Sequence, residues 1–129
     1  MKIVINGCFG GFGLSTEAMK MYAERKGLKH VKSTPHFQGD KGYDLLTPNH
    51  NLPDVITDKQ WNDPKNNIHS DRDIPRTDSD LIAVVEKLKT KANGWVANLS
   101  VVEIPDGISY EITDYDGVET VEETHRSWS

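Results

Sequence analysis

A glycine-rich segment near the N-terminus constrains the fold of this chain more than any other feature. Glycine occupies positions 7, 10, 11 and 13, which excludes an ordinary helix or strand interior there. Before this segment, Ile3, Val4 and Ile5 are consecutive β-branched residues, and they predict a short strand buried on both faces. After it, Ser15 is a good helix N-cap and Gly27 a good helix stop. The sequence therefore opens with a predicted strand, a tight turn and a helix.

The second half of the chain predicts one more helix and three strands. Apolar residues at 81, 84, 85, 88 and 92 form one helical stripe, capped by Asp78 or Ser79 and ended by the Asn-Gly pair at 93–94. Residues 99–104 predict a strand, and residues 108–113 alternate apolar and polar side chains as a half-buried strand does. The Asp-Tyr-Asp-Gly sequence at 114–117 predicts a hairpin turn, with the returning strand at 118–121.

The segment 28–77 between the two helices has a different character. It holds five of the six prolines and four of the five histidines, and its periodicity is weak. Its scattered apolar residues predict an ordered excursion with short elements rather than free coil. The whole chain, 1–129, is expected to be one α+β (or α/β) domain. It would have a small mixed sheet with two helices packed on it, a long irregular, loop-rich excursion between these helices, and the first strand paired with the later hairpin strands.

Composition narrows the classes of function. The net charge is −5 and the chain has no basic run, which disfavours nonspecific binding to nucleic acid or to an anionic membrane. No apolar stretch approaches the ~20 residues that span a bilayer. The single cysteine, Cys8, allows no intrachain disulfide, and the strand-like start lacks the pattern of a signal peptide. We therefore expect a cytoplasmic protein.

The glycine-rich turn is the leading candidate site. A turn between a strand and a helix N-terminus can present free backbone N–H groups and the positive end of the helix dipole to a phosphate or carboxylate. The sequence matches no standard signature, because Leu14-Ser15 stands where a P-loop needs Lys-Ser/Thr and Thr16 stands where a dinucleotide fingerprint needs glycine. The alternative is that the glycines only shape the turn and that Phe9 and Phe12 pack into the core.

Cationic side chains elsewhere could complete such a site. Arg72 and Arg76 precede the second predicted helix and could reach an anion at the turn, although a solvated charged loop is the alternative. Trp128 is expected to pack on the domain or on a partner. His125 and Arg126 would then line a pocket, or the tail would only close a sheet edge. The predicted ligand-binding residues are Cys8, Phe9, Gly10, Gly11, Phe12, Gly13, Ser15, Arg72, Arg76, His125 and Arg126.

Catalysis and metal binding have weaker support in the sequence. Cys8 lies near a helix N-terminus, which can lower a thiol pKa, but Leu14 stands where a phosphatase-type Cys-x5-Arg motif needs arginine. We assign no catalytic residue and rank binding above catalysis, leaving enzyme activity open, with Cys8, His125 and Asp116 as the candidates for a general base or nucleophile. No cofactor or metal is expected, because four histidines and four aspartates in the excursion lack metal-ligand spacing: His30, His36, His50, His69, Asp40, Asp44, Asp71 and Asp73.

Both ends of the chain resemble small uncharacterised proteins common in phages and prophages. The resemblance rests on the N-terminal motif MKIVIN-x-CFGGFGLS and on a C-terminal YDG…HRxW motif, and it covers the first ~27 and the last ~50 residues. In that family a basic residue often precedes the cysteine, whereas Gly7 stands here. The resemblance implies a phage accessory protein in the cytoplasm of a host cell, without implying a chemistry.

Three functions are compatible with these observations. The first is a binding protein that sequesters a phosphorylated, nucleotide-like small molecule at the glycine-rich turn, as an anti-defence protein would. The second is an inhibitor that binds a host protein through the 28–77 excursion. The third is a small nucleotide-processing enzyme. A homodimer is also consistent with a small sheet whose edge needs cover.

Overall fold

The computed structural model describes residues 1–8, 11–94 and 97–123, and it confirms the α+β class. The described residues also include short 3₁₀ turns at Pro64–Asn66, Asp71–Asp73 and Lys89–Ala92. The helices and strands, in chain order, are β1 (Lys2–Asn6), α1 (Thr16–Lys26), β2 (Lys29–Ser33), β3 (Asp44–Thr47), β4 (Val55–Ile56), α2 (Asp58–Asn62), α3 (Ser79–Leu88), β5 (Leu99–Glu103), β6 (Tyr110–Tyr115) and β7 (Val118–Glu123).

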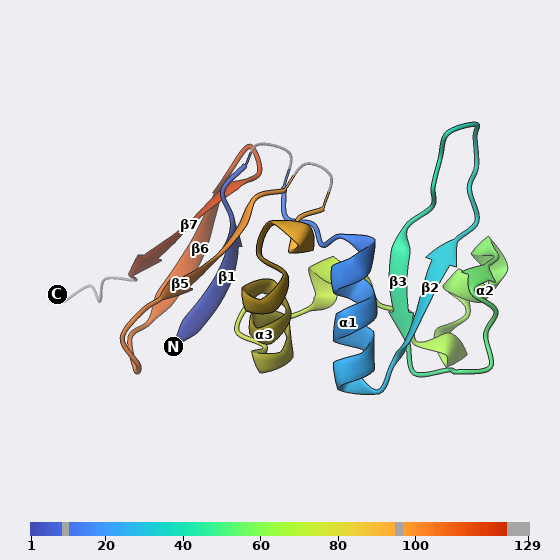
Figure 1. The fold of residues 1–129 in the computed structure, drawn as a ribbon, viewed down its shortest axis with the longest axis horizontal. Coiled ribbons are helices and arrows are strands. Elements are labelled where there is room, and N and C mark those ends of the chain that lie inside the picture. Colours follow the sequence, from blue (N-terminus) through green and yellow to red (C-terminus); the bar gives the residue numbers. More distant parts are fainter. Residues whose placement is uncertain (9–10, 95–96, 124–129) are drawn as a thin grey trace, which may run out of the picture.

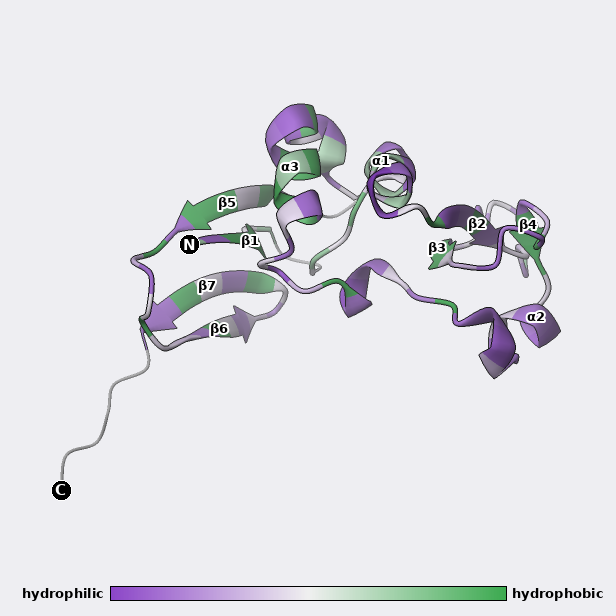
Figure 2. Ribbon diagram, turned by 90° about the horizontal axis from the view of Figure 1, so that it is seen from below, coloured by the Kyte–Doolittle hydropathy of each residue, from purple (hydrophilic) through white to green (hydrophobic). Residues whose placement is uncertain are grey.

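Strand β1 lies at the centre of one end of the molecule. It pairs antiparallel with β5, so that Ile3 lies opposite Val102 and Ile5 opposite Ser100. Figure 2 shows α3 on one side of this pair and the β6–β7 hairpin on the other. Ile3 and Val4 have no exposed surface, which confirms that the first predicted strand is buried on both faces.

The hairpin does not join β1 through a backbone ladder. The second edge of β1 is instead occupied by groups from Arg76 and Glu119. The Val4 N–H donates to the Arg76 carbonyl at 2.9 Å, and the Asn6 N–H donates to the Glu119 carboxylate at 2.9 Å. The expected pairing of the first strand with the hairpin strands is thus replaced by pairing with β5, because these groups already satisfy the backbone on the hairpin side.

The 28–77 excursion builds a second sheet and a second core. Its strand order is β3-β2-β4, with β2 antiparallel to β3 and parallel to β4. Val31, Leu45, Leu52 and Ile56 are buried together, and Trp61 packs against them. The prediction of an ordered excursion with short elements is confirmed.

Helix α1 lies between the two ends of the molecule, with α3 on one side and the three-stranded sheet on the other (Figure 1). It begins and ends where the sequence predicts. The Ser15 hydroxyl accepts the Ala18 N–H at 3.1 Å, and Gly27 has a φ of 69° in the left-handed region. Its apolar face, which includes Ala18, Met19 and Tyr22, joins the larger core around Val4 and Leu81.

Helix α3 begins after its predicted cap, Asp78, but ends earlier than the apolar stripe suggests. The α-helix stops at Leu88, and the chain continues to Ala92 as a 3₁₀ turn. The α-helix ends at Leu88 because Lys89 adopts a φ of 54°, outside the helical region, and Ser15 binds the following turn through its N–H to the Ala92 carbonyl and its hydroxyl to the Lys91 carbonyl. Within the described ranges, no helix is long and apolar enough to cross a membrane.

Candidate functional site

A groove in the described part of the chain lies beside the glycine-rich turn. Its volume is about 580 Å³, and it runs between the start of α1, the start of β3, helix α2 and the Asp71–Asp73 turn. We call it the aromatic groove. Its lining residues are Phe12, Leu14, Gly42, Tyr43, Asp44, Leu45, Trp61, Ser70, Asp71 and Arg72.

Three aromatic side chains from three separate segments line this groove. Tyr43 is 68% exposed, and its ring meets Trp61 edge to face with 5.9 Å between the ring centroids. Phe12 comes from the glycine-rich turn, and the Arg76 guanidinium lies 3.6 Å from its ring centroid. A large exposed tyrosine beside a second aromatic ring can stack against a flat ligand.

The glycine-rich turn uses much of its own hydrogen-bonding capacity within the chain. The N–H groups of Gly7 and Ser15 donate to the carbonyls of Asn98 and Ala92. The Cys8 N–H donates to the Asn6 side chain, and the Leu14 N–H donates to the Asp71 carboxylate at 3.0 Å. Fewer N–H groups of the turn are therefore free than the sequence predicts. The Asp71 carboxylate already accepts the Leu14 N–H, which an anion would otherwise bind.

The carboxylates of the groove differ in what they contact. Asp44 Oδ1 accepts from His30 Nε2 at 2.7 Å, and its Oδ2 accepts from the Thr16 hydroxyl at 2.8 Å. Burial acts to raise the pKa of Asp44, but these hydrogen bonds outweigh it and hold the pKa below its ordinary value. Asp71 accepts the Leu14 N–H with Oδ2 alone, and its Oδ1 has no hydrogen-bond partner in the described ranges.

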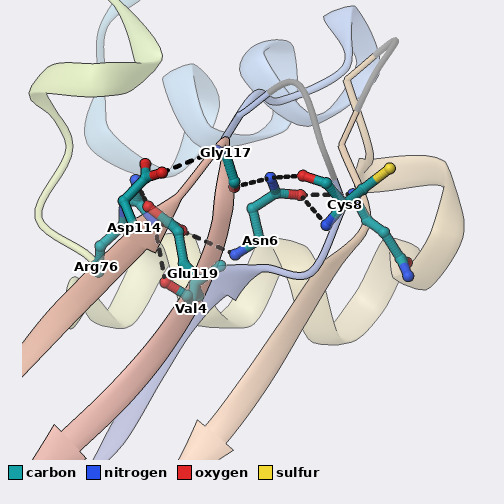
Figure 3. A network of polar contacts seen from close by, with 8 residues as sticks. Val4, Asn6, Cys8, Arg76, Asp114, Gly117 and Glu119 are labelled. Atoms are coloured by element: carbon teal, nitrogen blue, oxygen red, sulfur yellow. Dashed lines mark hydrogen bonds and ion pairs between the residues drawn. The ribbon is translucent and has the colours of Figure 1, made fainter.

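A buried ion pair lies next to Phe12 at the wall of the aromatic groove. Arg76 and Glu119 form a two-armed salt bridge, in which Nη2 lies 2.9 Å from Oε2 and Nη1 contacts Oε1 (Figure 3). Glu119 is only 7% exposed, although it lies on the β6–β7 hairpin. Because Arg76 also covers the Phe12 ring, this pair connects the hairpin to the wall of the groove.

Asn6 connects the same hairpin to the beginning of the glycine-rich turn. Its side-chain amide donates to the carbonyls of Cys8 and Gly117, both at 2.7 Å, and its side-chain oxygen accepts from the N–H groups of Cys8 and Asn98 (Figure 3). Cys8 is half-buried and has a free thiol. Both backbone groups of Cys8 therefore serve to fix the turn.

The structure brings together only part of the predicted ligand-binding set. Phe12 and Arg72 line the aromatic groove. Arg76 is held by Glu119, Ser15 caps α1, and Gly13 contacts Gly94 through its carbonyl. Gly11 adopts a φ of 103°, in keeping with a turn-shaping role. Phe9, Gly10, His125 and Arg126, together with Trp128, lie outside the described residues.

The histidines of the excursion lie apart from one another. His30 pairs with Asp44, His36 lies 3.3 Å from Asp58, and His50 contacts the Gly27 carbonyl. His69 pairs through its backbone with Leu46. In the part of the chain that the structure describes, no group of three or more His, Cys, Asp or Glu side chains is arranged to hold a metal ion.

Sequence reasoning missed most of the groove. Tyr43 and Trp61 belong to the scattered apolar residues of the excursion, and Asp44 and Asp71 to the acidic residues that lack metal-ligand spacing. Their aromatic and acidic character is visible in the sequence, but they come from β3 and the residue before it, from α2 and from a 3₁₀ turn, which only tertiary folding brings together. Glu119 lies in the predicted returning strand, where a charged side chain is expected to face solvent, so its burial had no local signal.

A second groove, of about 440 Å³, lies between α1 and the strands β2 and β4. Its rim carries Lys20 and Lys32 but also Glu24 and Asp54, so charges of both signs face it. The lining given by the described residues contains no Phe, Tyr or Trp side chain, and its one ring is the His30 imidazole. The aromatic groove is therefore the stronger candidate for binding a small molecule.

Comparison with known proteins identifies no relative: no family model, no curated protein and no solved structure matches the chain.

Proposed function

We propose that this protein binds a phosphorylated, nucleotide-like small molecule in the aromatic groove and sequesters it without converting it. The observation that carries the proposal is the placement of Phe12, Tyr43 and Trp61 around a groove that also holds Arg72. In keeping with the resemblance described above, the setting would be that of a phage accessory protein in the cytoplasm of a host cell.

The aromatic side chains favour a ligand with a flat ring. Tyr43 offers a mostly exposed ring, and its edge-to-face contact with Trp61 holds it in place. Stacking of a base on an aromatic side chain contributes about 1–3 kcal/mol. The lost entropy is small, because Tyr43 has few rotatable bonds and one neighbour already restricts them.

The charges of the groove limit how much phosphate the ligand can carry. Arg72 is exposed and has no ion-pair partner in the described ranges, so its guanidinium is available to a phosphate group. Asp44 and Asp71 line the same groove and repel further negative charge. We therefore propose that the ring enters the groove and that a single phosphate lies toward Arg72, away from the occupied N–H groups of the turn.

The proposal is tested by calorimetric titration with the four common nucleoside monophosphates, followed by mass analysis of the recovered ligand. Binding with the ligand intact supports sequestration, and conversion would identify an enzyme instead. Tyr43→Ala should weaken binding by roughly 5- to 100-fold. Tyr115→Ala is the matched control, because Tyr115 is 77% exposed and lies on the β6–β7 hairpin. Equal affinity of the two variants would refute the role of the groove.

A second candidate function is inhibition of a host protein through the 28–77 excursion. It is favoured by Phe37, which is 72% exposed in the segment between β2 and β3, and by Val55, which is exposed on the edge strand β4. Phe37→Ser should abolish such an activity while leaving nucleotide binding and the melting temperature unchanged. Inhibition of the host target by this variant at wild-type strength would exclude that surface.

A homodimer also belongs among the proposals. Strand β5 is the outer strand of its sheet, and such an edge can pair with a second copy. Light scattering of the purified chain at several concentrations measures the mass directly, and a monomer throughout would exclude a stable dimer.

A further inference from the structure

We infer that Asp71 makes the aromatic groove selective for rings that carry an exocyclic amino group. This inference rests on the proposed function, because it concerns the same groove and the same class of ligand. It adds a direction of selectivity: adenine-like and cytosine-like bases over analogues that lack the amino group.

The two oxygens of the Asp71 carboxylate have different surroundings. Oδ2 accepts the Leu14 N–H at 3.0 Å, which anchors the side chain beside the glycine-rich turn. Oδ1 has no partner among the described residues, and no buried side-chain oxygen or nitrogen there is left unsatisfied. Solvent therefore reaches Oδ1, and Asp71 lines the groove. Asp71 thus contributes one anchored oxygen and one solvent-accessible acceptor to the lining of the groove.

Asp44, the other carboxylate of the groove, does not offer a comparable acceptor. Its Oδ1 contacts His30, with the Lys32 ammonium 3.8 Å away, and its Oδ2 accepts from Thr16. Both oxygens of Asp44 thus accept hydrogen bonds from neighbouring side chains, whereas only Oδ2 of Asp71 accepts one from the described residues. A ligand ring that contacts Asp71 must therefore supply a hydrogen-bond donor for Oδ1.

An exocyclic amino group is the ring substituent that complements this acceptor. A carboxylate oxygen only accepts hydrogen bonds, so an amino group on the ring makes a charge-assisted bond with it. A ring carbon with hydrogen in place of the amino group leaves Oδ1 facing an apolar edge without its water, which is unfavourable. Discrimination by a site that hydrogen-bonds a substrate group works in this way, through the group that the wrong ligand leaves unpaired.

The experiment uses two pairs of ligands and two variants. Adenosine monophosphate is compared with purine riboside monophosphate, and cytidine monophosphate with pyrimidin-2-one riboside monophosphate. Within each pair only the amino group is replaced by hydrogen. The test variant is Asp71→Asn, in which the amide oxygen can still accept the Leu14 N–H while the amide NH₂ takes the place of Oδ1. The control is Asp73→Asn, whose carboxylate contacts Ser70 in the same 3₁₀ turn.

For wild type and Asp73→Asn, we expect the amino member of at least one pair to bind about tenfold more tightly than its partner. In Asp71→Asn that preference should disappear, with the weaker ligand binding as before. Equal affinities within both pairs in the wild type would overturn the inference, as would a preference that survives in Asp71→Asn.

Two further outcomes separate the inference from the proposed function. If only uridine monophosphate binds, whose base has no exocyclic amino group, nucleotide binding stands and the inference is wrong. If only guanosine monophosphate binds, equal affinity for inosine monophosphate, which lacks the 2-amino group, overturns the inference. If none of the monophosphates binds, the proposed function fails as well. The Leu14 amide resonance, followed by NMR, reports whether Asp71→Asn keeps the turn. Loss of all binding with that resonance displaced would assign Asp71 a role in shaping the turn and would overturn its role in selectivity.

Discussion

Replacing Glu119 by Gln tests whether the buried ion pair holds the hairpin against the rest of the molecule. The substitution keeps the size of the side chain and one acceptor for the Asn6 N–H. It removes the negative charge that faces both arms of the Arg76 guanidinium. Arg76 is then left partly buried, at 20% side-chain exposure, without its counter-charge.

The expected loss can be estimated from this geometry. Removing one partner of a fully buried pair costs about 3–5 kcal/mol. The partial exposure of Arg76 and the retained bond to Asn6 place Glu119→Gln lower, at about 2–3 kcal/mol. For a domain of this size each kcal/mol lowers the melting temperature by roughly 4 °C, so a decrease of roughly 8–12 °C is expected.

The measurement is thermal and urea unfolding of the wild type, Glu119→Gln and a matched control. Glu122→Gln serves as the control, because Glu122 lies on the same strand and is exposed. The control should unfold within about 0.5 kcal/mol of the wild type. Equal stability of the two variants would show that the ion pair is not a significant contact, and the account of how the hairpin docks on β1 would fail.

Two further predictions concern the excursion and its sheet. In Gly42→Ala the new Cβ would lie 2.2 Å from the Ser33 carbonyl oxygen, so we expect a loss of more than about 2 kcal/mol by urea unfolding, whereas Gly39→Ala, which also has a positive φ but meets open space, should lose only about 1 kcal/mol. Similar losses in both variants would contradict the predicted clash. Because the pKa of Asp44 is lowered in the folded state, this group stabilises the protein above its unfolded pKa of roughly 3.9, and that contribution is lost as the pH falls through the lowered value. Asp44→Asn should therefore unfold less steeply with acid between about pH 5 and 3 than the wild type, and parallel profiles would exclude the effect.

The sequence predicts the elements whose signals are local. Ser15 and Gly27 mark both ends of α1, and Asp78 marks the start of α3, because caps act within one turn of a helix. The Asp116-Gly117 pair likewise produces the expected hairpin, with positive φ at both residues. These predictions depend on a few neighbouring residues and not on the rest of the fold.

What the sequence could not predict depends on contacts between distant residues. The pairing of β1 with β5 alone was not predicted, since nothing near residue 4 indicates that Arg76 will occupy the second edge of β1. The aromatic groove was missed for the same reason: Phe12, Tyr43 and Trp61 are far apart in the sequence. The choice of the glycine-rich turn as a candidate site likewise did not reveal that several of its N–H groups donate to acceptors within the chain.

The internal hydrogen bonds of the glycine-rich turn change the role that its glycines are expected to have. A turn whose N–H groups were free would attract phosphate, and its glycines would serve the approach of an anion. In this chain Asp71 takes the place of that anion at Leu14, so the positive end of α1 is already matched by a negative charge from the same protein. A ligand that approaches the turn meets an open carboxylate oxygen and aromatic rings, with Arg72 as the available cation. Under the proposed function, the site should therefore recognise the ring of a nucleotide more strongly than its phosphate, and added phosphates should not increase affinity.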